Sequence, residues 1–188
     1  MIIDNQPIPG DQARVSVVVG VPPEVAFRIF TEEIDLWWRR GLKYRMAGTS
    51  PGSIQIEPRE GGLVFESFES GSEPKVFEIG KITLWKPPSR FAFDWRGANF
   101  SADEKTEVEV TFQRNSSGTL VTVTHRGWSR IRADHPVRHN LETVAFIGMI
   151  GLWWGDLMSS LRDYSAESRP VVSKKWNGHI LSSQAVSR

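Results

Sequence analysis

Short runs of β-branched and aromatic residues dominate the middle of the chain, separated by glycine, proline and serine. In the run 105–114, Glu107 and Glu109 fall on one parity and Val108 on the other. A period of two is typical of a strand with one wet and one buried face. Similar runs predict strands at residues 13–19, 53–58, 63–69, 75–85, 90–95, 105–114 and 119–126. Gly80, inside a strong strand pattern, predicts a bulge or a sharp bend.

Apolar residues three and four positions apart predict two short helices after the first strand. Pro23 suits the first turn of a helix, where its missing N–H costs nothing. Thr31, followed by two glutamates, predicts the cap of the second helix. The apolar stripe of that helix is formed by Ile34, Trp37 and Trp38.

A long helix is predicted near the C-terminal end of the sequence. Asp134-His135-Pro136 indicates its start, and its apolar pattern runs to about Tyr164. The eleven residues 144–154 are all uncharged. A helix that is apolar all round is buried on more than one side. We therefore expect the sheet to cover one face, and another element or a second subunit to cover the rest.

The order of these elements predicts an α+β fold in which a curved antiparallel sheet wraps a long C-terminal helix, the helix-grip arrangement. It excludes a doubly wound α/β fold, in which helices alternate with strands. We expect one domain at residues 13–165, an N-terminal arm at 1–12 and a C-terminal arm at 166–188. Trp176 and Ile180 are expected to tie down the second arm.

Charge and composition narrow the function classes. The 188 residues carry a formal net charge of +1 and no cysteine. We expect no nucleic-acid partner, because binding of phosphate backbones needs a clustered basic surface. A disulfide framework, thiol catalysis and thiolate metal sites are excluded. No signal sequence is visible and the apolar run is shorter than a membrane span, so we expect a cytoplasmic protein without membrane insertion.

Tryptophan is unusually abundant, with eight residues beside ten phenylalanines. So many rigid rings predict a wide interior, which either encloses a pocket for an apolar ligand or is filled by the rings themselves. The expected cavity-lining residues are Trp37, Trp38, Phe65, Trp85, Trp95, Phe112, His125, Trp128, Phe146, Met149 and Trp153.

His125 is the one inward-pointing candidate for chemistry, as an acid, a base or a polar anchor; a hydrogen-bonded core histidine is the alternative. His135, His139 and Glu142 have the spacing of a zinc-binding helix face, but a solvated first turn also explains them. No hydrolase elbow, phosphate loop or dinucleotide fingerprint occurs. We therefore expect no catalytic residue, no metal and no cofactor.

Several motifs in a fixed order resemble the START-like superfamily, also called Bet v 1-like or polyketide cyclase/dehydrase-like. The branch most similar is named for the activator of the heat-shock-protein-90 ATPase. The resemblance covers roughly residues 13–164 and is carried by Pro23–Thr31, Trp37-Trp38, Glu57–Gly62, Gly80–Trp95, Val108–Phe112, Gly118–Trp128 and the tryptophan-rich final helix.

This resemblance implies a hydrophobic cavity between the sheet and the final helix. It leaves three functions open. The first is binding of a hydrophobic or amphipathic small molecule. The second is a protein interaction module, in the manner of the chaperone activator, which includes self-association as a homodimer. The third is a polyketide cyclase-like enzyme that uses His125; we expect a binding protein rather than an enzyme.

Overall fold

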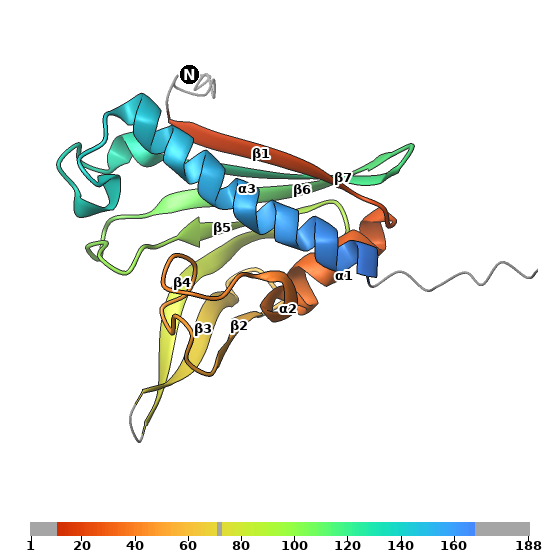
Figure 1. Ribbon diagram of the computed structural model, residues 1–188, viewed down its shortest axis with the longest axis horizontal. Coiled ribbons are helices and arrows are strands. Elements are labelled where there is room, and N and C mark those ends of the chain that lie inside the picture. Colours follow the sequence, from red (N-terminus) through yellow and green to blue (C-terminus); the bar gives the residue numbers. More distant parts are fainter. Residues whose placement is uncertain (1–10, 71–72, 168–188) are drawn as a thin grey trace, which may run out of the picture.

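The computed structural model describes residues 11–70 and 73–167 as a curved antiparallel sheet with a long helix across its concave face (Figure 1). The predicted α+β helix-grip fold is confirmed, and the strand ends differ from the predicted ones by at most two residues. The predicted arms fall almost entirely on residues 1–10 and 168–188, outside the described residues. The elements are β1 (Gln12–Val19), α1 (Pro23–Glu32), α2 (Ile34–Trp37), β2 (Gly52–Ile56), β3 (Leu63–Ser70), β4 (Glu73–Lys86), β5 (Arg90–Trp95), β6 (Thr106–Asn115), β7 (Gly118–Arg126) and α3 (Thr143–Glu167).

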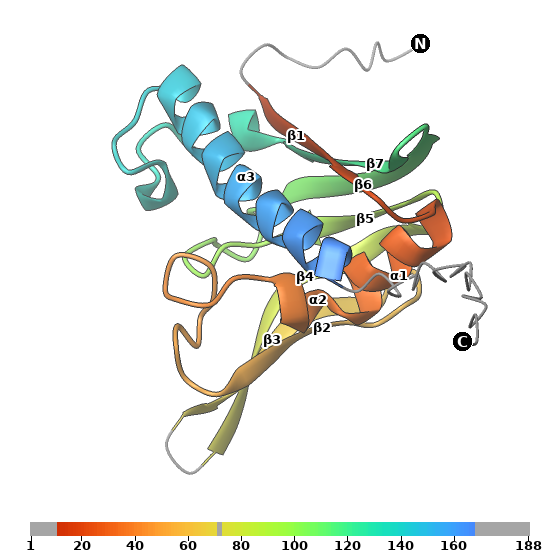
Figure 2. The ribbon, with the colours of Figure 1, turned by 45° about the vertical axis from the view of Figure 1, so that its right-hand side comes forward.

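The seven strands have the order β1-β7-β6-β5-β4-β3-β2, and each pair is antiparallel. The helices α1 and α2 carry the chain from β1 at one edge to β2 at the other. The sheet curls into a half-barrel, and Figure 2 shows α3 lying within the curve.

Two register irregularities bend the long strand β4 against both of its neighbours. The register shifts between Val64 and Phe65 on the β3 side and between Ile82 and Leu84 on the β5 side. At Gly80 a Cβ atom would lie 1.6 Å from the backbone oxygen of Asp94, so only glycine fits there. The bend predicted at Gly80 is thus confirmed, and it turns the sheet around the interior.

The pleat of the sheet separates a wet convex face from a buried concave one. Along β6 the valines at 108 and 110 are fully buried, while Glu107 and Glu109 are half-buried on the other face. Those two glutamates form ion pairs with Arg126 on the neighbouring strand β7. The alternation read from the sequence is therefore confirmed.

The helix α1 covers one end of the concave face with an aromatic cluster. Phe27 packs at ring-centroid distances of 5.2 Å from Trp85 and 5.1 Å from Phe112. The predicted capping role of Thr31 is wrong, because Thr31 lies inside α1 and its hydroxyl donates to the carbonyl oxygen of Phe27 at 2.8 Å. The break between the two helices falls instead at Glu33.

The helix α3 begins later than the sequence indicated. Pro136 starts only a 3-10 turn, Pro136–Arg138, whose first residues are capped by the ring nitrogen Nδ1 of His135. His139 and Asn140 then adopt positive φ angles of 49° and 60°, which ends the turn. The helix starts at Thr143. His135, His139 and Glu142 therefore do not share a helix face.

By length and composition α3 is the one described helix that is apolar enough to cross a membrane, with a mean hydropathy of 1.4. Core helices of soluble domains meet the same criterion. Here α3 is tied to the sheet and to the C-terminal end of α1. The indole N–H of Trp154 donates to His125 of β7, and the hydroxyl of Tyr164 donates to the carboxylate of Glu33.

Candidate ligand-binding cavity

A half-open cavity of about 810 Å³ lies at the end of the half-barrel opposite α1. The strands β5 and β7 and the helix α3 form its inner walls. Four connecting segments form the rest: the loop 38–51, the β5–β6 loop, the turn after β7 and the turn before α3. Its size falls within the range of roughly 300–1,000 Å³ that is usual for small-molecule pockets.

Five of the residues expected to line a cavity lie on its wall: Trp95, His125, Trp128, Met149 and Trp153. They come from β5, from the end of β7 and the turn after it, and from α3. The rings are in mutual contact, with Trp95 and Trp153 centroids 5.6 Å apart and His125 and Trp128 centroids 4.5 Å apart. Their role in ligand binding stays a prediction.

Three of the expected residues lie too far toward α1 or on the wrong face. Trp85 and Phe112 belong to the cluster around Phe27, so α1 fills the space beside them. Phe65 lies between Val64 and Glu66, which are both buried on the concave face. Because the side chains of a strand alternate, Phe65 is on the convex face, where it is half-buried.

The other three expected residues lie behind the cavity wall. Trp37 is fully buried and donates its indole N–H to the carbonyl oxygen of Ile29 at 3.2 Å. Trp38 packs against both Trp95 and Trp153, with ring centroids 6.4 and 5.7 Å away. Phe146 is fully buried and packs against Trp128, with ring centroids 5.0 Å apart. All three stabilise the wall and do not line it.

Half of the wall comes from loop residues that the sequence analysis missed. Leu42 and Lys43 belong to the loop 38–51, Asn99 to the β5–β6 loop, and Val137 and His139 to the turn before α3. No hydrophobic period marks these segments, so their meeting at one mouth depends on tertiary contacts. The one signal available in the sequence was Leu42, an apolar residue in a basic loop. In the structure its side chain is 88% exposed.

The loop 38–51 is held in place by a buried arginine. The side chain of Arg45 is fully buried and pairs with the carboxylate of Asp35. It also donates to the carbonyl oxygens of Asp35 at 3.0 Å and Trp38 at 2.8 Å. On the far side of the loop, the buried carboxylate of Glu66 accepts the backbone N–H of Met46 at 2.7 Å. These bonds position the loop at the cavity mouth.

A second set of bonds joins this loop to α3. The carboxylate of Asp156 accepts from the ammonium of Lys43 at 2.6 Å and from the hydroxyl of Tyr44 at 2.7 Å. These two hydrogen bonds lower the pKa of Asp156, and the bond to Asp156 raises the pKa of Lys43. The indole N–H of Trp153 donates to the carbonyl oxygen of Lys43 at 2.8 Å.

His125 has both ring nitrogens engaged with the protein. The indole N–H of Trp154 donates to Nδ1 at 3.1 Å, so Nδ1 carries no proton. The proton is on Nε2, which lies 2.8 Å from the hydroxyl oxygen of Thr106 and donates to it. Burial lowers the pKa of His125 to about 3, so the ring is neutral. This arrangement is that of a hydrogen-bonded core histidine whose edge meets the cavity.

Trp128 is buried in the wall, and its indole N–H has no hydrogen-bond partner in the described part of the chain. A buried donor without an acceptor is uncommon in folded proteins. Because the nitrogen atom itself is inaccessible, this donor is not exposed to the open cavity.

A half-barrel that encloses a long helix and an aromatic cavity defines a START-like domain. The chain belongs to the family described as activator of Hsp90 ATPase homolog 1-like proteins, which residues 20–145 match. No curated protein matches the sequence significantly.

Solved structures share the fold. A protein from Nitrosomonas europaea is 15% identical, with a TM-score of 0.57 over 87% of this chain and 100% of its own. One from Rhodobacter sphaeroides is 15% identical, with a TM-score of 0.56 over 84% and 93%. The Aha1 dimer from Colwellia psychrerythraea is 17% identical, with a TM-score of 0.52 over 81% and 93%. At these identities the likeness establishes the fold alone.

Proposed function

We propose that this protein binds a hydrophobic or amphipathic small molecule in the cavity beside α3. The observation that carries the proposal is the space itself. The seven tryptophans in the described part of the chain do not fill the interior, and about 810 Å³ stays open against the rings of Trp95, Trp128 and Trp153. Concave, mostly apolar space with a few polar groups is typical of ligand sites.

The arrangement supports binding more than catalysis. A cyclase-like mechanism needs at least two polar groups that converge on the ligand and can exchange a proton. Both ring nitrogens of His125 are hydrogen-bonded within the protein, one to Thr106 and the other to Trp154. No carboxylate belongs to the described wall.

A fluorescent probe tests the proposal directly. N-phenyl-1-naphthylamine, a neutral aromatic, should bind with a rise in emission as it leaves water. Met149→Trp should weaken this binding at least tenfold, because Met149 is on the wall and an indole there occupies ligand space. Val76→Trp is the matched control, since Val76 is exposed on β4 and does not line the cavity. Equal affinities in both variants would contradict the assignment of the cavity.

Self-association is the second candidate function, and the outer face of α3 favours it. Val144 is 83% exposed there, and Leu152, which also lies at the rim of the cavity, is 74% exposed. Gly148, Gly151 and Gly155 have no neighbour within 4 Å of an added Cβ atom, so another helix could approach closely. The Colwellia neighbour is described as a dimer, which supports self-association here.

Sedimentation velocity at increasing concentration should then show a dimer. Gly148→Lys should convert it to a folded monomer, because the added charge meets open space in the single chain but would face the apolar partner helix. Arg114→Lys, at the tip of the β6–β7 hairpin, should leave the dimer intact. A wild-type protein that sediments as a monomer at all concentrations would exclude this function.

A further inference from the structure

We infer that the ligand is an amphipathic carboxylate, with its apolar body inside the cavity and its anionic group at the mouth. This inference rests on the proposed binding function and adds the chemical class of the ligand. It follows from how polar groups are distributed over the described wall.

The polar side chains at the mouth all offer hydrogen-bond donors. Lys43 carries an ammonium, Asn99 an amide and His139 an imidazole, and all three residues are exposed. They come from three separate segments that meet around the opening: the loop 38–51, the β5–β6 loop and the turn before α3. No aspartate or glutamate belongs to the described wall. Asn99 and His139 also carry acceptor atoms, but Lys43 only donates and bears a positive charge. An anionic acceptor is therefore more complementary to this mouth than an ammonium.

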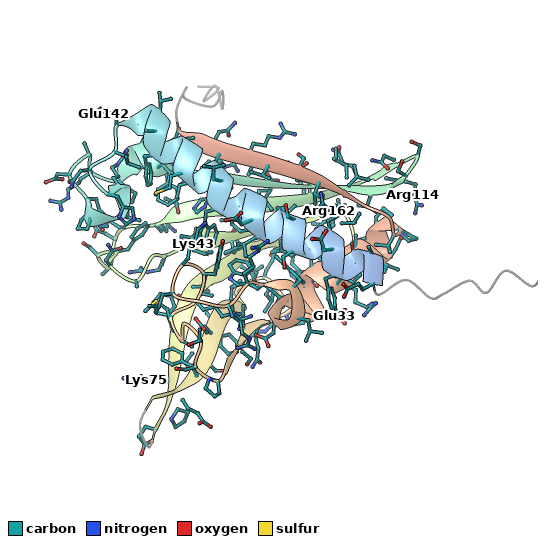
Figure 3. The ribbon with its side chains drawn as sticks, in the orientation of Figure 1. Glu33, Lys43, Lys75, Arg114, Glu142 and Arg162 are labelled. Atoms are coloured by element: carbon teal, nitrogen blue, oxygen red, sulfur yellow. The ribbon has the colours of Figure 1, made fainter. Side chains whose placement is uncertain are left out.

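The ammonium group of Lys43 is held at the mouth, and only part of its hydrogen-bonding capacity is taken up by Asp156. Its ammonium has three protons, and the carboxylate of Asp156 accepts one of them at 2.6 Å. Asp156 lies outside the described wall and is shared with the hydroxyl of Tyr44. The Trp153–Lys43 hydrogen bond fixes the backbone of this residue. Figure 3 shows Lys43 beside α3, while Arg114 lies at the opposite end of the sheet.

The inner wall is apolar and receives the body of the ligand. Trp128, Ile150 and Trp95 are buried or half-buried there. The gradient from apolar floor to donor-rich mouth orients an amphipathic molecule with its head outward.

Three ligands of equal chain length test the class: dodecanoic acid, dodecan-1-ol and dodecylamine. In competition against the bound naphthylamine probe at pH 7.5, the acid should bind at least tenfold more tightly than the alcohol, and the amine most weakly. Lys43→Gln and His139→Gln should each lower the affinity for the acid severalfold and leave the affinity for the alcohol unchanged. Lys43→Arg should retain acid binding, and Arg114→Gln, which removes a distant charge, should change nothing.

The outcomes separate the two proposals. If the acid, alcohol and amine compete equally, or if none displaces the probe, the inference of a carboxylate ligand is overturned. Binding of the probe would still support the cavity as a ligand site. If the probe itself fails to bind, the proposed function fails first. A loss of both acid and alcohol affinity in Lys43→Gln would show a structural role of the Lys43–Asp156 pair and would also overturn the inference.

Discussion

Arg45→Met should lower the free energy of unfolding by about 3 kcal/mol, since it removes one partner of a buried ion pair. Asp35 would keep only Arg40 at 3.4 Å and the backbone N–H of Ile54 at 2.9 Å. The Arg45 side chain is fully buried, whereas Asp35 keeps 28% of its side chain exposed, which places the expected loss at the lower end of the usual range. The change also frees the carbonyl oxygens of Asp35 and Trp38. Urea unfolding followed by tryptophan fluorescence measures the loss.

A matched exposed pair provides the control for this result. Arg59 pairs with Glu57 at 3.1 Å, but its side chain is 67% exposed. Arg59→Met should therefore cost no more than about 1 kcal/mol. Adding Asp35→Asn to Arg45→Met should recover part of the loss, because it removes a charge that has lost its buried partner, while the amide oxygen still accepts from Ile54. Equal losses in Arg45→Met and Arg59→Met would show that the buried pair does not hold the loop.

The loop that Arg45 fixes also marks the limit of sequence reasoning about this site. Strands such as β6 could be predicted because burial on one face imposes an alternation that the residues display. The loop 38–51 has no such period: its position depends on Asp35, Glu66 and Asp156, which lie in three other elements. Lys43, the charged residue of the cavity mouth, was missed for this reason.

The start of α3 was mispredicted for a local reason. Pro136 and the residue before it have the features of a helix N-terminus, and they do form a capped turn. Two consecutive residues with positive φ, His139 and Asn140, then redirect the chain. Histidine and asparagine are both among the residues that tolerate this conformation, so the pair was the available signal.

Parity alone does not locate a residue along a curved sheet, which is why several residues expected to line the cavity lie elsewhere. Trp95 and Phe112 both lie on the concave side, yet Trp95 meets the open end and Phe112 meets α1. Which end stays open depends on where the helices cover the sheet. Phe65 shows the opposite error, since its strand was recognised but its face was not.

Acid should destabilise this protein through His125 well before its carboxylates are protonated. The pKa of His125 is about 3 in the folded protein, against an ordinary value of 6.5. Only the unfolded chain takes up this proton between those two values. The stabilisation is therefore complete above pH 6.5 and is lost as the pH falls toward 3. The slope is about 1.4 kcal/mol per pH unit.

Protonation is opposed by the structure as well as by burial. A proton on Nδ1 would point at the indole N–H of Trp154, 3.1 Å away, so two donors would face each other. Asp156 and Glu104 also have lowered pKa values, caused chiefly by hydrogen bonds from Lys43 and from the backbone of Ser101. Their contributions are lost only as the pH falls below about 4, near the ordinary pKa of a carboxyl group.

Urea unfolding between pH 7.5 and 4.5 separates the histidine from the carboxylates. Wild type should lose about 2–3 kcal/mol over this interval. His125→Asn should be less stable at pH 7.5, since it loses buried contacts. As the pH falls, however, its free energy of unfolding should decrease less steeply than that of wild type, by the contribution of one proton. His139→Gln, which removes an exposed imidazole, should follow the wild-type curve. Parallel curves for wild type and His125→Asn would mean that His125 takes up its proton without unfolding. His125 would then again be a candidate acid or base in the cavity.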